Sequence, residues 1–470
     1  MSFPKYPEYK NSGVEWLGEV PAHWEVKRLR YVAELNPPKA EVRSLPPESS
    51  VSFIPMEAVG DNGSLSLEQV RPISEVLAGY TYVSEGDVTI AKITPCFENG
   101  KGAVMRGLEN HIGFGTTELT VMRPKAELTT SDYLYRVVSS EPFRVLGESS
   151  MYGAGGQKRV PDDFVRNFTI AWPPYEEQLL IQSFLDHETA RIDAMVEQQK
   201  RLIELLKEKR QAVISHAVTK GLDPDVPMKD SGVEWLGEVP EHWELKRLKH
   251  LVSEPVQMGP FGSSLTQVLN KPDELKVYGQ ENYITGDFSK GNRWVNGGLF
   301  PGYEKYNLVP GDLVFTRKGS IGNCRIVPND VQKGIIDSDS IRVRVNGALV
   351  QASFVALLAH EAWYVSQQLS SEKRGAVLGG LNSSNIATLR IALPPLNEQK
   401  KIMDTVSKRL AEMDEAICMS CDGIELLKER RSALISAAVT GKIDVRGWQA
   451  DQQSEHPEVL MAAEARATYG

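Results

Sequence analysis

Few short motifs in this sequence could do covalent chemistry, and each lacks something that the chemistry requires. Trp172-Pro173-Pro174-Tyr175 resembles the motif with which amino-methyltransferases hold a target amine, but an indole N–H cannot accept that hydrogen bond. Leu393-Pro394-Pro395-Leu396 repeats only the prolines, so we interpret both proline pairs as helix starts. Pro272–Lys276 contains the Asp, Glu and Lys that a magnesium-dependent nuclease uses, but they stand together in one turn-like segment instead of on adjacent strands. We therefore predict no catalytic residue on this chain.

Motifs for nucleotides and metals are also incomplete. The sequence has no Walker A motif, and Gly113-Phe114-Gly115 lacks the spacing of a dinucleotide-binding loop. Cys418 and Cys421 are three residues apart in a predicted helix, without the second pair that a zinc site would need. We interpret them as two reduced thiols, and we expect no metal and no cofactor on this chain.

Two long predicted helices must position whatever the rest of the chain carries. The run 173–218 has apolar residues in steps of three and four, and the same pattern returns at a shift of 221 positions. A helix of about 42 residues is roughly 63 Å long, so it needs a partner of similar length. We predict an intramolecular antiparallel coiled coil. Its seam residues are Ile181, Leu185, Ile192, Met195, Leu202, Leu206, Val213, Ile402, Val406, Met413, Leu427 and Leu434.

The chain consists of two copies of one unit. Residues 12–29 read SGVEWLGEVPAHWEVKRL and residues 231–248 read SGVEWLGEVPEHWELKRL, so the two openings are nearly identical. Residues 30–172 and 249–393, here called module one and module two, differ almost completely in sequence. Both contain short β-rich runs, a Gly-Asp turn (Gly86-Asp87 and Gly311-Asp312) and one helix-like run (132–146 and 352–369).

These observations predict an α+β fold with pseudo-twofold internal duplication. The predicted parts are 1–172 (first repeat and module one), 173–220 (helix), 221–393 (second repeat and module two), 394–441 (helix) and 442–470 (flexible tail). Four cysteines in 470 residues suit a reducing cytosol, and no apolar run approaches the length of a membrane span. The net charge of -9 argues against a wholly basic nucleic-acid coat but leaves room for a local basic surface.

The doubled motifs resemble a known family. The SGVEWLGEVPxHW opening and the PPxxEQxxI helix start, each present twice between about residues 9 and 442, are similar to the DNA-specificity subunit of type I restriction–modification enzymes. The resemblance implies two target-recognition domains, each reading half of a bipartite DNA sequence. It also implies helices that set the spacing and dock two methyltransferase subunits, with restriction subunits joining outside. S-adenosylmethionine would then belong to the methyltransferase partner, and ATP and magnesium to the restriction partner.

The candidates for DNA contact are basic and amide residues on predicted loops of the modules. Arg and Lys pair with phosphates or guanine edges, and Asn and Gln read adenine. The candidates are Lys92, Lys101, Gln157, Lys158 and Arg159 in module one, and Arg293, Arg317, Lys318, Lys373, Arg374 and Asn382 in module two. A solvated surface charge is the simpler explanation for any one of them, so the prediction rests on the groups.

A different function also fits the pattern. A coiled-coil adaptor whose two modules bind proteins would need long helices, although it would not need two equivalent divergent modules. Module one has 14 basic and 18 acidic residues, a balance of -4, whereas module two has 15 and 12, a balance of +3. We therefore expect weak DNA binding by this chain alone, with a partner supplying part of the electrostatic attraction.

Overall fold

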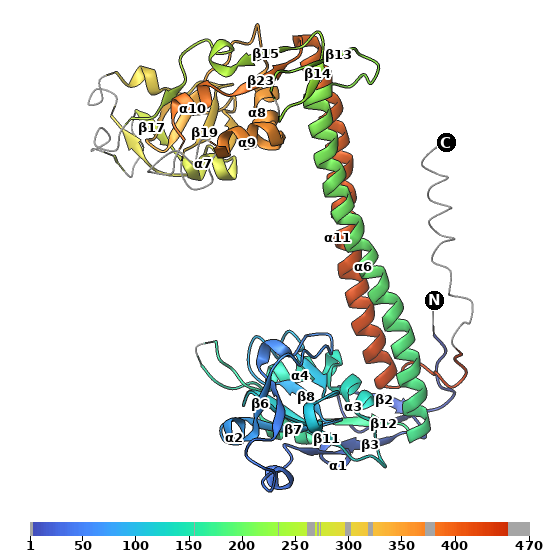
Figure 1. The fold of residues 1–470 in the computed structure, drawn as a ribbon. Helices are drawn as coiled ribbons and strands as arrows, with labels where there is room; N and C mark the ends of the chain where they lie inside the picture. Colours follow the sequence, from blue (N-terminus) through green and yellow to red (C-terminus); the bar gives the residue numbers. More distant parts are fainter. Residues whose placement is uncertain are drawn as a thin grey trace. The chain divides into compact units, whose positions relative to one another are not determined.

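The structure is a computed structural model that describes residues 3–154, 156–233, 235–260, 268–269, 272, 274–296, 302–317, 323–371 and 381–449. It divides into two compact units, Met1–Gln199 with Asp422–Gly470, and Lys200–Cys421. Each unit contains one opening, one module and half of each long helix (Figure 1). None of the helices in the described part of the chain is long and apolar enough to cross a membrane.

Module one is built on two four-stranded sheets, with the orders β6-β5-β10-β7 and β4-β11-β8-β9. Among the strands that the structure describes in module one, only β5 and β10 pair in parallel. All four residues of β8 are buried, as expected for a central strand of Val, Thr, Ile and Ala. The strands are β4 (Ala33–Leu35), β5 (Ser50–Ile54), β6 (Val70–Pro72), β7 (Thr81–Ser84), β8 (Val88–Ala91), β9 (Gly102–Val104), β10 (Ile112–Gly115) and β11 (Leu119–Pro124). The helices are α1 (Leu29–Val32), α2 (Ile73–Val76), α3 (Ser131–Val138), α4 (Glu141–Ser150) and α5 (Asp162–Asn167).

Module two repeats this arrangement. Its sheets have the orders β18-β17-β21 and β16-β22-β19-β20, and β17 and β21 pair in parallel as β5 and β10 do. The strands are β16 (Gln257–Met258), β17 (Leu275–Tyr278), β18 (Trp294–Val295), β19 (Leu313–Thr316), β20 (Cys324–Ile326), β21 (Gly334–Ile336) and β22 (Ser340–Val343). The helices are α7 (Gln280–Thr285), α8 (Ala352–Glu361), α9 (Trp363–Ser371) and α10 (Ser383–Ala387). The predicted pair of similar α+β domains is therefore confirmed.

Each single helix-like run predicted in a module is two helices in the structure. In module one the break lies between α3 and α4, where Pro142 in the first turn of α4 cannot donate a backbone hydrogen bond to a preceding turn. The Ser140 hydroxyl donates to the Val137 carbonyl at 2.6 Å and closes the end of α3. In module two the extended backbone of Ala362 separates α8 from α9. The helical residues agree with the prediction, whereas each run contains a break that the sequence pattern does not indicate.

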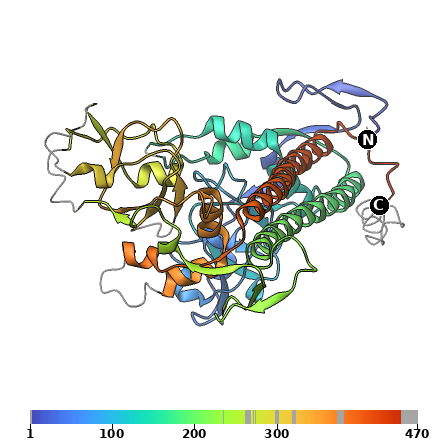
Figure 2. The same ribbon diagram turned by 90° about the horizontal axis from the view of Figure 1, so that it is seen from above.

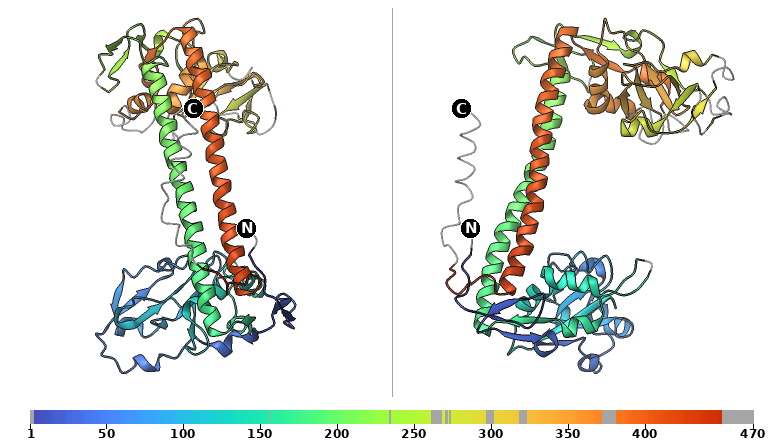
Figure 3. Two further views of the ribbon diagram at one scale, coloured as in Figure 1. Left: turned by 90° about the vertical axis from the view of Figure 1, so that its right-hand side faces the viewer. Right: turned by 180° about the vertical axis from the view of Figure 1, so that it is seen from behind.

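The two long helices are α6 (Tyr175–Lys220) and α11 (Leu396–Val439), with 46 and 44 residues. In the first unit Ile192 of α6 shares a hydrophobic core with Leu434 of α11, and in the second unit Ile214 of α6 shares one with Ile402 of α11. Early residues of one helix therefore pack on late residues of the other, which confirms the antiparallel coiled coil. The green and red helices lie side by side in Figures 2 and 3.

Burial along the predicted seam is uneven. Ile181, Leu185, Ile192, Ile402, Val406 and Leu434 are buried, whereas Leu206, Val213, Met413 and Leu427 are half-buried. Met195 and Leu202 depart from the prediction, because 37% and 42% of their surfaces are exposed. Next to Val213, Ile214 is fully buried. An α-helix with 3.6 residues per turn drifts relative to a strict seven-residue repeat, so the buried stripe leaves the predicted positions.

Each opening holds the start of a long helix through a carboxylate. The openings and the residues just before them form β1 (Tyr9–Asn11), β2 (Glu19–Pro21) and β3 (Glu25–Arg28) in the first unit, and β13 (Met228–Asp230), β14 (Glu238–Pro240) and β15 (Glu244–Arg247) in the second. Trp24 Nε1 donates to Glu177 Oε1 at 3.1 Å, and His23 Nε2 lies 2.7 Å from Glu177 Oε2. The second unit repeats both distances with Trp243, His242 and Glu398. The doubled His-Trp and Glu-Gln motifs thus form one structural clasp per unit.

The neighbouring glutamine connects each helix start to its module. Gln178 Nε2 donates to the carbonyls of Pro173 and Leu128 at 3.1 and 2.9 Å. Gln399 makes the corresponding bonds to Pro394 and Leu349 at 2.9 and 3.1 Å. The strands that precede the proline pairs are β12 (Thr169–Trp172), which pairs with β3, and β23 (Arg390–Leu393), which pairs with β15. The opening, the last strand of the module and the helix start are therefore joined in each unit.

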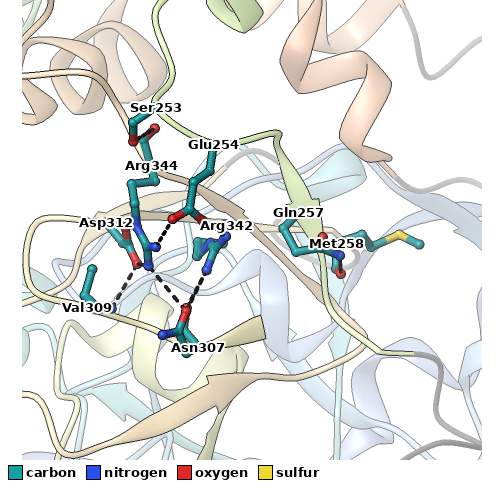
Figure 4. Close-up of polar contacts among 9 residues, drawn as sticks. All are labelled: Ser253, Glu254, Gln257, Met258, Asn307, Val309, Asp312, Arg342 and Arg344. Carbon is teal, nitrogen blue, oxygen red and sulfur yellow. Dashed lines mark hydrogen bonds and ion pairs between the residues drawn. The ribbon is translucent and has the colours of Figure 1, made fainter. Parts of the chain in front are cut away.

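The Asp of each Gly-Asp turn is buried and binds an arginine. In module two Arg344 donates to both carboxylate oxygens of Asp312 at 2.7 and 2.8 Å, and Asp312 is 1% exposed. Figure 4 shows Asp312 and Glu254 pointing toward the Arg344 guanidinium. In module one Arg123 binds Asp87 in the same way at 2.8 and 2.9 Å. The hydrogen-bonded Asp312 carboxylate raises the pKa of Arg344, and Asp87 does the same for Arg123.

The beginning of the predicted flexible tail is packed. Ile443 and Val445 are buried in the core of the first unit, and the Asp444 N–H donates to the Pro4 carbonyl at 2.9 Å. Trp448 lies edge-on against Phe184 with ring centroids 5.5 Å apart. These apolar residues were overlooked because the surrounding sequence is polar. Residues 450–470 lie outside the described part.

Candidate nucleic-acid interface

Most of the described candidate residues gather at one equivalent place in each module. In module one the backbone N–H of Lys92, just after β8, donates to Glu118 O at 2.9 Å, and the Val160 N–H donates to Lys92 O at 2.8 Å. In module two Arg317 follows β19, its N–H donates to Asp339 O at 2.9 Å, and the Leu381 N–H donates to Arg317 O at 3.1 Å. We call this place the polar edge. It consists of residues 92, 116–118, 152–154 and 156–160 in module one, and residues 293, 317, 337–339 and 381–382 in module two.

The loop that carries three candidates of module one is held at several points. Tyr152 and Arg159 exchange two backbone hydrogen bonds at 3.1 and 2.9 Å. The Thr94 hydroxyl donates to Gly156 O at 2.6 Å and accepts from the Lys158 N–H at 3.1 Å. The side chains of Gln157 and Lys158 are exposed, and so is 63% of Tyr152. The backbone is thus fixed while these side chains face solvent, an arrangement suited to contact with a large ligand.

Arg159 is oriented by a carboxylate. Its Nε and Nη2 donate to Glu118 Oε2 and Oε1 at 2.9 and 2.7 Å, while its side chain is 37% exposed. The hydrogen bond from Arg159 lowers the pKa of Glu118, so that carboxyl is ionised at neutral pH. Lys101 is placed differently, because its ammonium donates to Met56 O at 3.1 Å and supports a neighbouring loop. The Lys101 ammonium therefore already has a backbone partner inside module one.

Module two brings Arg317 and Asn382 together and adds Arg293. Arg317 Nε donates to Leu381 O at 3.0 Å, directly before Asn382. The Asn382 side chain accepts from the Asn385 N–H at 2.9 Å as the N-cap of α10, so its oxygen already has a structural role. Arg293 Nη2 donates to Asp337 Oδ2 at 3.0 Å. Lys318, Lys373 and Arg374 lie outside the described residues.

A polar hollow opens beside Arg293. Its volume is about 450 Å³, and its lining residues are Gln280, Glu281, Asn292, Arg293, Asp337 and Asp339. Arg293 Nε also lies 3.7 Å from Glu281 Oε1, so two carboxylates lie beside this guanidinium. Amides, carboxylates and a guanidinium in one hollow can donate to and accept from base edges. Within the described residues, no group of three or more His, Cys, Asp or Glu side chains could hold a metal ion.

The polar edge also contains residues that the sequence analysis does not predict. Glu118, Asp337 and Tyr152 contribute to it, yet none is a basic or amide residue like the candidates. The available signal was positional, because GTTEL (115–119) and IDSDSI (336–341) each connect two β-rich runs at the same place in the repeat. An alignment of the two modules by predicted strands would have placed these loops together.

The fold and the polar edge agree with the similarity of this chain to known proteins. Residues 240–416, which include all of module two, match the family model of the type I restriction modification DNA specificity domain. The chain is 45% identical over 161 residues to the EcoAI specificity subunit of Escherichia coli, covering 34% of this chain and 27% of that subunit. It thus matches little more than a quarter of that relative's length. It is also 22% identical over 452 residues to a putative specificity subunit, MjaX, of Methanocaldococcus jannaschii, covering 95% and 99%.

Two solved structures share the fold. One, described as showing complex assembly and conformational transition of the type I R-M system, has a TM-score of 0.67 and covers 89% of this chain and 98% of its own. The HsdS subunit from Thermoanaerobacter tengcongensis has a TM-score of 0.58 and covers 90% and 98%. Both are 17% identical to this chain, so they support the fold alone. Residues 240–416 thus match the DNA specificity domain of type I restriction–modification systems, and the whole chain is similar in sequence to specificity subunits and shares the fold of the HsdS subunit.

Proposed function

We propose that this chain reads a bipartite DNA sequence for a type I restriction–modification complex, with one half-site per module. The observation that carries the proposal is the polar edge. The strands, loops and backbone hydrogen bonds that form the polar edge are equivalent in the two modules. The side chains at equivalent positions differ: Lys92 corresponds to Arg317, and Thr116 corresponds to Asp337. One scaffold with two different sets of polar side chains fits two different half-sites. Each good pair of hydrogen bonds to a base edge contributes about 1–3 kcal/mol of discrimination.

The duplicated framework supports two copies of one partner. The openings at 12–29 and 231–248 differ at only two positions, and both bind a helix start through the same His-Trp-Glu contacts. Equivalent surfaces suit docking of two methyltransferase subunits, which would supply S-adenosylmethionine and take the target adenine out of the duplex. Restriction subunits would bring ATP and magnesium. This chain would supply sequence recognition and no catalytic group.

The test is selection of DNA from a random pool. The chain, copurified with its methyltransferase partner, is mixed with random-sequence duplexes, and the bound fraction is sequenced. We expect enrichment of two short defined blocks separated by an undefined spacer of fixed length. An assembled complex that enriches no sequence, or one uninterrupted block, would contradict the proposal. A protein-binding adaptor predicts no enrichment, and the family model that residues 240–416 match favours DNA recognition.

A further inference from the structure

In each module, an acidic residue of the same loop binds one side of an arginine. Glu118 lies on the loop between β10 and β11, and Asp337 on the equivalent loop between β21 and β22. Glu118 accepts from Nε and Nη2 of Arg159 at 2.9 and 2.7 Å, whereas Asp337 accepts from Nη2 of Arg293 at 3.0 Å and Glu281 lies 3.7 Å from its Nε. A guanidinium is a planar fork, so its Nη1 end is turned away from a carboxylate on the Nε–Nη2 side. Each arginine is thereby oriented with one end toward a second ligand.

The two arginines come from unrelated positions of the repeat. Arg159 lies in the segment before α5, 41 residues after Glu118, whereas Arg293 lies before β18, 44 residues before Asp337. The structural pairs behave differently, because Arg123–Asp87 and Arg344–Asp312 occupy equivalent strands and turns. An ion pair needed for the shared fold thus recurs at the same place. At the polar edge the acidic loop recurs, but the arginine comes from a different position of the repeat in each module. This is expected if the arginine serves a function that differs between modules.

Exposure separates the two kinds of pair. The side chains of Arg159 and Arg293 are 37% and 38% exposed, compared with 28% for Arg123. The aspartate partners of the structural pairs, Asp87 and Asp312, are 1% exposed, compared with 24% for Glu118 and 12% for Asp337. The arginines of the polar edge are therefore accessible to a ligand, and they are already ordered. Prior ordering reduces the entropy lost when a long side chain is fixed on binding.

The chemistry of these pairs favours a base edge over a phosphate. A carboxylate beside the guanidinium cancels much of its net charge, which weakens its attraction to the DNA backbone. Two parallel N–H donors remain suited to a planar pair of acceptors, and guanine offers O6 and N7 in that geometry in the major groove. We propose that Arg159 and Arg293 each read a guanine in their own half-site, with Glu118 and Asp337 as positioning residues. This inference rests on the proposed function.

The experiment uses the same DNA selection with the full-length chain in its methyltransferase complex. Arg159→Lys keeps the charge but removes the planar fork, so the preference for guanine at one position of one half-site should fall on the order of tenfold to a hundredfold. Arg293→Lys should do the same in the other half-site. Glu118→Gln should weaken the same preference as Arg159→Lys, with a smaller loss. The matched controls are Arg123→Lys and Arg344→Lys, which should lower the melting temperature and leave base preferences unchanged.

The outcomes separate this inference from the proposed function. If the wild-type complex selects a bipartite sequence in which at least one half-site has no G·C pair, the inference is wrong and the proposed function stands. The same holds if Arg159→Lys, folded with a wild-type melting temperature, keeps every base preference. If the assembled wild-type complex selects no bipartite sequence at all, the proposed function itself fails.

Discussion

Single residues at the polar edge have different tasks although many carry the same charge. Lys158 is exposed on a fixed loop, whereas the Lys101 ammonium donates to a backbone carbonyl. Arg159 is oriented by Glu118, and Arg123 is held by the buried Asp87. Positive charge alone therefore does not identify a DNA contact in these modules. The hydrogen-bond partner and the exposed fraction of each side chain separate the proposed contacts from the residues that support the fold.

Lys158→Ala should weaken DNA binding by the assembled complex nearly equally for all sequences, because an exposed ammonium is suited to phosphate. The slope of log affinity against log salt concentration should become shallower by about 1. Binding titrations at several salt concentrations measure this slope. Lys101→Ala is the matched control and should leave the slope unchanged. Equal changes of slope in both variants would show that the two lysines were assigned incorrectly.

Asp87→Asn should destabilise module one by about 3 kcal/mol, because it leaves the Arg123 charge without its buried partner. Glu41 also pairs with Arg123, but its side chain is 54% exposed. Glu41→Gln should therefore cost less than about 1 kcal/mol. Urea unfolding of both variants compares the two losses of stability. Similar losses would mean that burial of Asp87 does not determine the strength of this pair.

At the scale of elements, the carboxylate clasps hold each long helix to its opening. The two clasps share their His-Trp-Glu contacts, but they differ in burial. The Glu177 side chain is 7% exposed and also accepts from the Tyr6 hydroxyl at 2.6 Å, whereas the Glu398 side chain is 24% exposed. The near-identical openings thus produce clasps that differ in burial and by one hydrogen bond. The first unit gains its extra contact from the N-terminal segment.

Glu177→Ala should be more destabilising than Glu398→Ala. Loss of the Glu177 carboxylate leaves the buried Trp24 N–H and Tyr6 O–H without an acceptor, at about 1–3 kcal/mol for each donor. Glu398→Ala removes the acceptor of Trp243 in a more exposed setting. Thermal unfolding of the matched variants provides the comparison. A larger loss for Glu398→Ala would contradict the ranking by burial.

Helix length should control the spacer between the half-sites. Asp193 pairs with Arg431 at 3.0 Å, and the equivalent Asp414 lies 3.6 Å from Arg210, so both units keep the same antiparallel register. Seven residues inserted at matched positions in both helices preserve the heptad pattern and add about 10.5 Å. The selected sequence should then keep both half-sites and gain about three base pairs of spacer. An altered half-site with an unchanged spacer would contradict this role of the helices.

At the scale of the whole molecule, the sequence was most informative where the chain repeats itself. The doubled openings, the proline pairs and the heptad pattern predicted the duplicated α+β fold and the helix pair. The pairing of Glu118 with Arg159, or of Asp337 with Arg293, depends on strand register across more than 40 residues. Without that register, the sequence does not distinguish a loop carboxylate that pairs with an arginine from a solvated surface charge. The drift of burial from Val213 to Ile214 likewise depends on how two helices pack.

The central claim is that this one chain gives its complex two independent half-site specificities. The most direct measurement is genome-wide mapping of N6-methyladenine in cells that express the chain together with its methyltransferase partner. We expect one new methylated motif with two defined halves around an undefined spacer of fixed length. No new methylation, from a complex shown to assemble and to bind S-adenosylmethionine, would contradict it.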